Sequence, residues 1–136
     1  MPIAKSKLNQ MVDLWDNQKL TYDEELKTIA HQLAIRWLRH LATNVFNCEK
    51  GDYVVRSNKA GIAVSGEVTL HINRVPNYPL GLYIQICQYS SGQAVLYRTC
   101  NNLADYVGHT NHFASLREAV DKPEIFFKIL PQKVTV

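Results

Sequence analysis

Apolar and other residues alternate along residues 62–73. The apolar series is Ile62, Val64, Gly66, Val68, Leu70 and Ile72. The series between them is Ala63, Ser65, Glu67, Thr69, His71 and Asn73. A period of two predicts one long strand, Ile62–Asn73, with a buried face and a solvated face. This strand needs a partner on its apolar side and leaves its polar side open.

The partner is expected in the first third of the chain, where apolar residues recur at three- and four-residue steps. That repeat is typical of a helix with one buried face, and we place the helix at Tyr22–Asn47. Thr21 and Glu24 have the spacing of a capping box at its start. The helix is about 39 Å long and the strand about 40 Å, so one is expected to cover the other. Gly66 then marks close approach by a bulky helix residue such as Trp37.

A shorter helix, Lys5–Trp15, is expected to precede the long one. The sheet is expected to contain three further strands, at Tyr53–Ser57, Leu82–Tyr89 and Val95–Cys100. A two-residue turn at 91–92 would make the last two strands an antiparallel hairpin.

In that hairpin register Gln85 lies opposite Arg98, and the charged Arg98 stays out of the core. Capping patterns predict two short helices after the sheet, Leu116–Val120 and Pro123–Leu130. The sequence therefore predicts a single α+β domain, residues 1–136. Two N-terminal helices, one of them long, pack on one face of a four-stranded antiparallel meander, and short C-terminal helices close it.

Composition agrees with one ordinary domain and narrows the environment. Of 136 residues, 46% are apolar and 20% charged, and no apolar run approaches the ~20 residues of a membrane-spanning helix. Cys48, Cys87 and Cys100 are odd in number and lack C-x-x-C spacing, which favours reduced thiols in the cytoplasm. No membrane partner is expected.

The polar side of the sheet is the first candidate site. In the predicted register it gathers one polar, aromatic-bearing surface: Glu67, Thr69, His71, Tyr83, Gln85 and Arg98. Such a surface suits a small ligand or a second copy of the chain. The alternative is a solvated sheet face with weak cross-strand pairs.

A polar loop gathers the second set of candidates, Asp105, His109 and His112, with Cys100 upstream. Two imidazoles and a carboxylate suit a metal or acid–base chemistry. H-x-x-H lacks the i, i+4 spacing of a helical zinc motif. A carboxylate that orders an imidazole is the structural alternative.

The third candidate is basic and lies on the long helix, at Arg36, Arg39 and His40, with His31 two turns earlier. It would suit a phosphate or an acidic partner, or it is a solvated helix face.

These observations lead us to expect a non-enzymatic cytoplasmic binding or interaction protein that forms a homodimer. None of the familiar nucleotide-binding, hydrolase or zinc-protease motifs occurs, so no catalytic residue, metal or cofactor is assigned. The expected ligand-binding residues are Glu67, His71, Tyr83, Gln85, Arg98, Asp105, His109 and His112.

Two other classes stay open. One is a small enzyme or metalloprotein that uses the loop with Asp105. The other is a weak nucleic-acid binder that uses Arg56, Lys59, Arg74 and Arg98. The net charge is only +3 and no Lys/Arg run exists, so nucleic acid is the less favoured partner.

Overall fold

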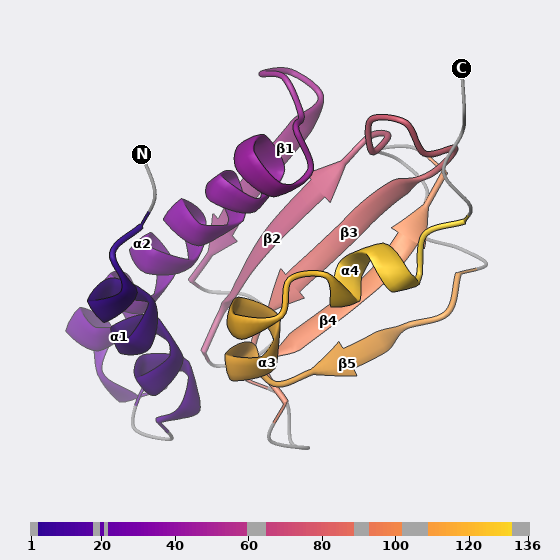
Figure 1. The fold of residues 1–136 in the computed structure, drawn as a ribbon. Helices are drawn as coiled ribbons and strands as arrows, with labels where there is room; N and C mark the ends of the chain where they lie inside the picture. Colours follow the sequence, from indigo (N-terminus) through magenta and orange to yellow (C-terminus); the bar gives the residue numbers. More distant parts are fainter. Residues whose placement is uncertain are drawn as a thin grey trace.

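The computed structural model describes residues 3–17, 20, 22–59, 65–88, 93–101 and 109–131. It confirms the predicted α+β architecture, with N-terminal helices, an antiparallel sheet and short C-terminal helices (Figure 1). The first part of the predicted long strand, residues 62–64, lies outside the described residues.

The N-terminal helices are α1 (Lys5–Asp16) and α2 (Glu24–His40). The cap of α2 differs from the predicted one: the Asp23 carboxylate accepts hydrogen bonds from the backbone N–H groups of Glu25 and Leu26. A carboxylate at this position satisfies free amides and complements the positive end of the helix dipole. Thr21, the predicted cap, lies outside the described residues.

The last part of the predicted long helix is a π-helix, η2 (Leu41–Val45). The Phe46 N–H donates to the Leu41 carbonyl at 2.8 Å, a five-residue step that widens the helix. Asn47 then takes a left-handed conformation with φ 59°, which ends the helix. The sequence pattern indicated helix here but not its wider turn.

The sheet contains five strands, one more than predicted. They are β1 (Tyr53–Asn58), β2 (Glu67–Ile72), β3 (Gly81–Ile86), β4 (Val95–Cys100) and β5 (His112–Ala114). Their spatial order follows the chain, and every neighbouring pair is antiparallel. β5 was missed because three residues are too short to show a period of two.

The predicted register of the β3–β4 hairpin is wrong by two residues. Tyr83, rather than Gln85, lies opposite Arg98. A shift of two residues leaves each side chain on its predicted face, whereas a shift of one would exchange the faces. The predicted turn at 91–92 lies outside the described residues.

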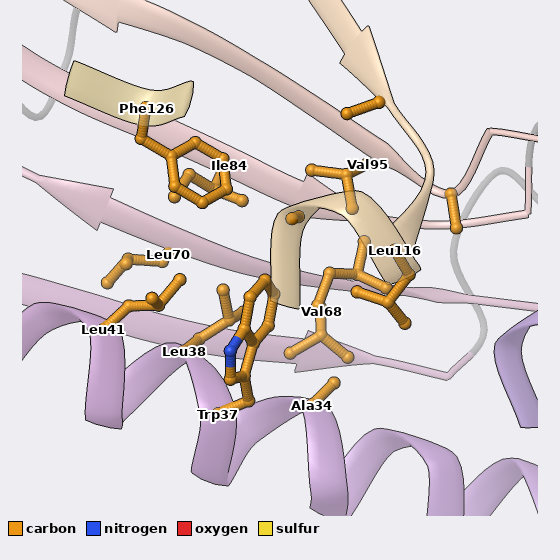
Figure 2. Packing of buried hydrophobic residues seen from close by; sticks show 14 of the residues in the cluster. Ala34, Trp37, Leu38, Leu41, Val68, Leu70, Ile84, Val95, Leu116 and Phe126 are labelled. Carbon is orange, nitrogen blue, oxygen red and sulfur yellow. The ribbon is translucent and has the colours of Figure 1, made fainter. Parts of the chain in front are cut away.

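One face of the sheet carries the core, and the described helices cover it. Side chains of α2, including Ala34, Trp37 and Leu38, lie against Val68 and Leu70 of β2 (Figure 2). Full burial of a valine or leucine side chain such as Val68 or Leu70 contributes about 1.5–3 kcal/mol to the stability of the fold.

The C-terminal helices α3 (Leu116–Asp121) and α4 (Ile125–Lys128) complete the same layer. Leu116 and Phe126 are fully buried in the core cluster, and Figure 2 shows Phe126 beside Ile84 of β3. α1 is held against α2 by Trp15, whose indole N–H donates to the Ala30 carbonyl of α2 at 3.1 Å. The opposite face of the sheet, called the outer face below, is left for other contacts.

Gly66 is a point of close approach, but its neighbour is not Trp37 as predicted. The residue precedes β2 with φ +71°, and a Cβ there would lie 2.5 Å from the Asn58 carbonyl oxygen and 2.9 Å from Cε1 of His31. Gly66 therefore lies outside the regular strand, and β2 begins at the next residue, Glu67, because a positive φ suits glycine and not an extended chain.

His31 joins α2 to the sheet at this corner. Its side chain is 2% exposed, so it does not lie on a solvated helix face. Nδ1 lies 2.7 Å from the Ser57 hydroxyl, and Nε2 lies 2.9 Å from the Ser65 carbonyl oxygen. Its ring lies 5.3 Å from that of Trp15. Burial lowers the pKa of His31 below its usual 6.5, and Lys59 and Lys27 lower it further, against a raising contribution from the Ser65 carbonyl.

The close packing around Gly66 can be tested with two alanine substitutions. Gly66→Ala is expected to lower the unfolding free energy by about 3 kcal/mol, because strain and collision add. Gly51→Ala is the matched control, since Gly51 has φ +101° but nothing within 4 Å of the place that a Cβ would take, and strain alone costs about 1 kcal/mol. Urea unfolding measures both. Equal losses would show that the close approach at Gly66 is unimportant.

His31 should make stability depend on pH. The folded-state pKa is lower than the usual 6.5 of the unfolded chain, so the unfolded state takes up the proton first as pH falls. The stabilisation is complete above 6.5 and is lost as pH falls through the folded-state pKa. The advantage of wild type over His31→Gln in urea unfolding should therefore shrink between pH 7.5 and 5. An advantage that stays constant over this range contradicts the prediction.

Candidate functional site

The strand register orders the outer face into rows that cross the sheet. One row contains Val54, His71, Tyr83 and Arg98, and the next contains Arg56, Thr69, Gln85, Leu96 and Phe113. A shorter third row pairs Asn58 with Glu67. The three rows run side by side because alternate residues of a strand share one face.

A hollow of about 320 Å³ lies on this face over β1, β2 and β3. We call it the outer groove. Its lining residues are Val54, Arg56, Asn58, Glu67, Thr69, His71 and Tyr83. Three of the predicted ligand-binding residues, Glu67, His71 and Tyr83, therefore line one hollow.

Two opposite charges line the outer groove. The Glu67 carboxylate accepts a hydrogen bond through Oε2 from the Gln85 side-chain amide at 2.7 Å. Arg56 is exposed on β1, and no described residue makes a hydrogen bond or ion pair with its guanidinium. Gln85 thus supports the groove from the neighbouring row and holds one of its charged groups in place.

At one side of the groove, aromatic and charged side chains pack against one another. The His71 ring meets the Tyr83 ring edge-on at 5.5 Å between centroids. The Arg98 guanidinium carbon lies 5.6 Å from the centroid of the same Tyr83 ring, a favourable cation–π distance. Arg98 therefore lies next to the groove and orders its tyrosine wall.

The alternative of a solvated outer face does not hold for the middle of the sheet. His71 is 7% exposed, Arg98 8% and Cys100 0%. The Cys100 sulfur lies 3.3 Å from Nε2 of His71, so the thiol buttresses the imidazole from behind. The face of the Tyr83 ring lies against the Arg98 guanidinium and offsets part of the cost of removing this charge from water.

The predicted histidine loop is only partly described. Asp105 lies outside the described residues. His109 Nδ1 lies 2.8 Å from the Thr99 hydroxyl, and His112 of β5 stacks on Tyr97 at 5.4 Å. No group of three or more His, Cys, Asp or Glu side chains suited to a metal ion occurs within the described ranges. Cys100 faces His71, away from these two contacts.

The basic cluster on α2 surrounds a second hollow, of about 310 Å³, lined by Ile3, Arg36, Arg39, His40, Thr43 and Asn44. The His40 Nδ1 lies 2.8 Å from the Asn44 side-chain amide. Arg39 and His40 occupy the last turn of α2, and the helical backbone continues through η2 before it ends. The structure therefore brings all three basic residues of the cluster to one hollow.

Two further observations bear on partners. Burial of Arg98 removes one of the four basic residues proposed to contact a nucleic-acid backbone. In the part of the chain that is described, no helix is long and apolar enough to span a membrane.

No protein-family model, curated protein or solved structure matches this chain. Functional inference therefore depends on the geometry of the residues themselves.

Four lining residues of the outer groove were not among the predicted ligand-binding residues: Val54, Arg56, Asn58 and Thr69. Thr69 was expected on the polar sheet face, and Arg56 was considered only for nucleic acid. The signal was present in the alternation of Val54, Arg56 and Asn58 along β1, which places all three on one face. Which face they share depends on the pairing of β1 with β2. That pairing becomes clear only in the tertiary structure.

The Tyr83–Arg98 contact predicts a coupling that a double-mutant cycle can measure. Tyr83→Leu and Arg98→Met, made singly and together, should show an interaction energy of about 0.5–2 kcal/mol in urea unfolding. Tyr78→Leu with Arg98→Met is the control cycle, since Tyr78 lies against Phe127, and it should be additive within about 0.5 kcal/mol. Additivity in both cycles would refute the contact.

Proposed function

We propose that this protein is a non-enzymatic binding protein that holds a small amphipathic ligand in the outer groove. The observation that carries the proposal is the composition of this one hollow. It combines an aromatic wall at Tyr83, a guanidinium at Arg56 and a carboxylate at Glu67. Small-molecule sites typically pair apolar surface with a few polar groups that fix orientation.

The way in which neighbouring residues hold the lining side chains in place favours the same proposal. All seven are held on strands of one hydrogen-bonded sheet. Gln85 orients Glu67, and Arg98 and Cys100 pack against Tyr83 and His71. Side chains ordered in advance lose less conformational entropy when a ligand binds.

A cytoplasmic location is part of the proposal, and the cysteines support it. Cys48, Cys87 and Cys100 are all buried free thiols. Burial, followed by the charge of Asp52, raises the pKa of Cys48 to about 11, and burial also raises the pKa of Cys87. Neutral, buried thiols react slowly and suit a protein that keeps its cysteines reduced.

We also propose a homodimer that uses the outer face beside the groove. Phe113 supports it, because this aromatic side chain is 44% exposed on β5 at the far end of the row that begins with Arg56. Exposed aromatic residues are enriched where proteins associate. Native mass spectrometry reports the subunit number directly.

The ligand proposal is tested by filling the groove. Thr69→Trp places a bulky ring in the hollow, whereas the control Tyr22→Trp changes a side chain that is 90% exposed and lies outside the lining residues. Wild type and Tyr22→Trp should bind compounds in native mass spectrometry, and in an NMR screen of a small-molecule library the bound compounds should shift amides of β1–β3. Thr69→Trp should lose them by tenfold or more. Absence of any binding to folded wild type would contradict the proposal.

A further inference from the structure

We infer that the ligand of the outer groove is a free α-amino acid with an apolar or aromatic side chain. Its carboxylate would lie at Arg56, its ammonium group at Glu67 and its side chain against Tyr83. This inference rests on the proposed function, because it names the chemical class that the same groove selects.

Arg56 provides the site for the carboxylate. It lines the groove from an edge strand, is exposed, and makes no ion pair with any residue of the described chain. A guanidinium presents two parallel N–H donors that match the two oxygens of a carboxylate. Thr69, the cross-strand partner of Arg56, lines the same hollow and adds a hydroxyl.

Glu67 provides the site for the ammonium group. Its Oε2 accepts the Gln85 amide at 2.7 Å, while no described residue donates to its Oε1. The Asn58 side chain lies across from Glu67 at the same end of the groove. An ammonium group brings three donors, and Oε1 of Glu67 can accept from it as part of a charge-assisted pair.

The pairing of β1 with β2 places the two charged residues within reach of one small ligand. Arg56 pairs with Thr69 and Glu67 pairs with Asn58, so the two are diagonal neighbours, whose backbone positions in an antiparallel pair are about 7–8 Å apart. Their charged groups form no ion pair with each other. One amino acid carries a carboxylate and an ammonium group on the same carbon, and it can contact both side chains through hydrogen bonds of about 2.8 Å.

The order of the rows on the outer face indicates where the side chain of the bound amino acid lies. The row of Arg56 lies between the row of Glu67 on one side and the row of Val54, His71 and Tyr83 on the other. Tyr83 lines the same hollow, so a ligand whose carboxylate lies at Arg56 and whose ammonium group lies at Glu67 can place its side chain against the Tyr83 ring. The aromatic wall favours an apolar or aromatic side chain there.

The test compares free amino acids with derivatives that lack either the carboxylate or the ammonium charge. L-Phenylalanine and L-leucine are titrated by NMR into the whole protein, alongside L-phenylalaninamide and N-acetyl-L-phenylalanine. The free amino acids should shift amides of β1–β3. The amide, which has no carboxylate, and the N-acetyl derivative, which has no ammonium group, should each bind at least tenfold more weakly.

Two variants assign each charge to its residue. Arg56→Gln should weaken L-phenylalanine tenfold or more and abolish its advantage over the amide. Glu67→Gln should abolish its advantage over the N-acetyl derivative. Arg36→Gln and Glu124→Gln change the same residue types outside the groove and should leave all affinities unchanged.

The possible outcomes separate the two proposals. Derivatives that bind as tightly as the free amino acids would overturn the amino-acid inference. So would library compounds that bind in the groove while L-phenylalanine and L-leucine do not, and in both cases the proposed binding function would stand. Binding of no compound at all, in a protein shown to be folded, would overturn both.

Discussion

The apolar stripe of α2 packs against the inner side of the sheet, and the rest of the architecture depends on this contact. Trp37 and Leu38 reach Val68 and Leu70 of β2 because a helical repeat and a strand repeat each present one continuous apolar face. Because α2 covers only part of the inner face of the sheet, α3 and α4 cover the rest of that face. The outer face is then left with polar and aromatic side chains, which is where the groove forms.

A small corner determines how closely helix and sheet approach. Gly66 leaves no room for a side chain beside the Asn58 carbonyl and the His31 ring. His31 in turn contacts Ser57 at the end of β1 and Ser65 just before β2. The imidazole thus ties α2 to both strands that carry the charged groove residues. Its neutral form suits this position, because burial lowers its pKa.

The outer face of the sheet contains both buried side chains and the exposed charged residues of the groove. Arg98 and His71 are nearly as buried as core residues, yet they lie opposite the hydrophobic core. They pack around Tyr83 and order it, while Arg56 and Glu67 remain available at the margin. This division gives the groove a firm aromatic wall and two charges that a ligand can reach. It also explains why the proposed ligand must be both apolar and charged.

Sequence alone determined the elements whose periods are long and regular. The α2 repeat, the faces of β2 and β4, and the Ser115 cap of α3, which accepts the Glu118 N–H, were all predictable because each depends on neighbours within a few residues. The faces survived even the two-residue error in the β3–β4 register, since an even shift preserves parity.

Only the tertiary structure decided the features that join distant segments. The π-turn at Leu41, the fifth strand at His112, the burial of His31 and the pairing of Cys100 with His71 all depend on contacts that local patterns do not encode. The groove is of the same kind. Its two charges, Arg56 and Glu67, are separated along the chain by the residues that connect β1 to β2, and they share a hollow because strand pairing places them on adjacent rows.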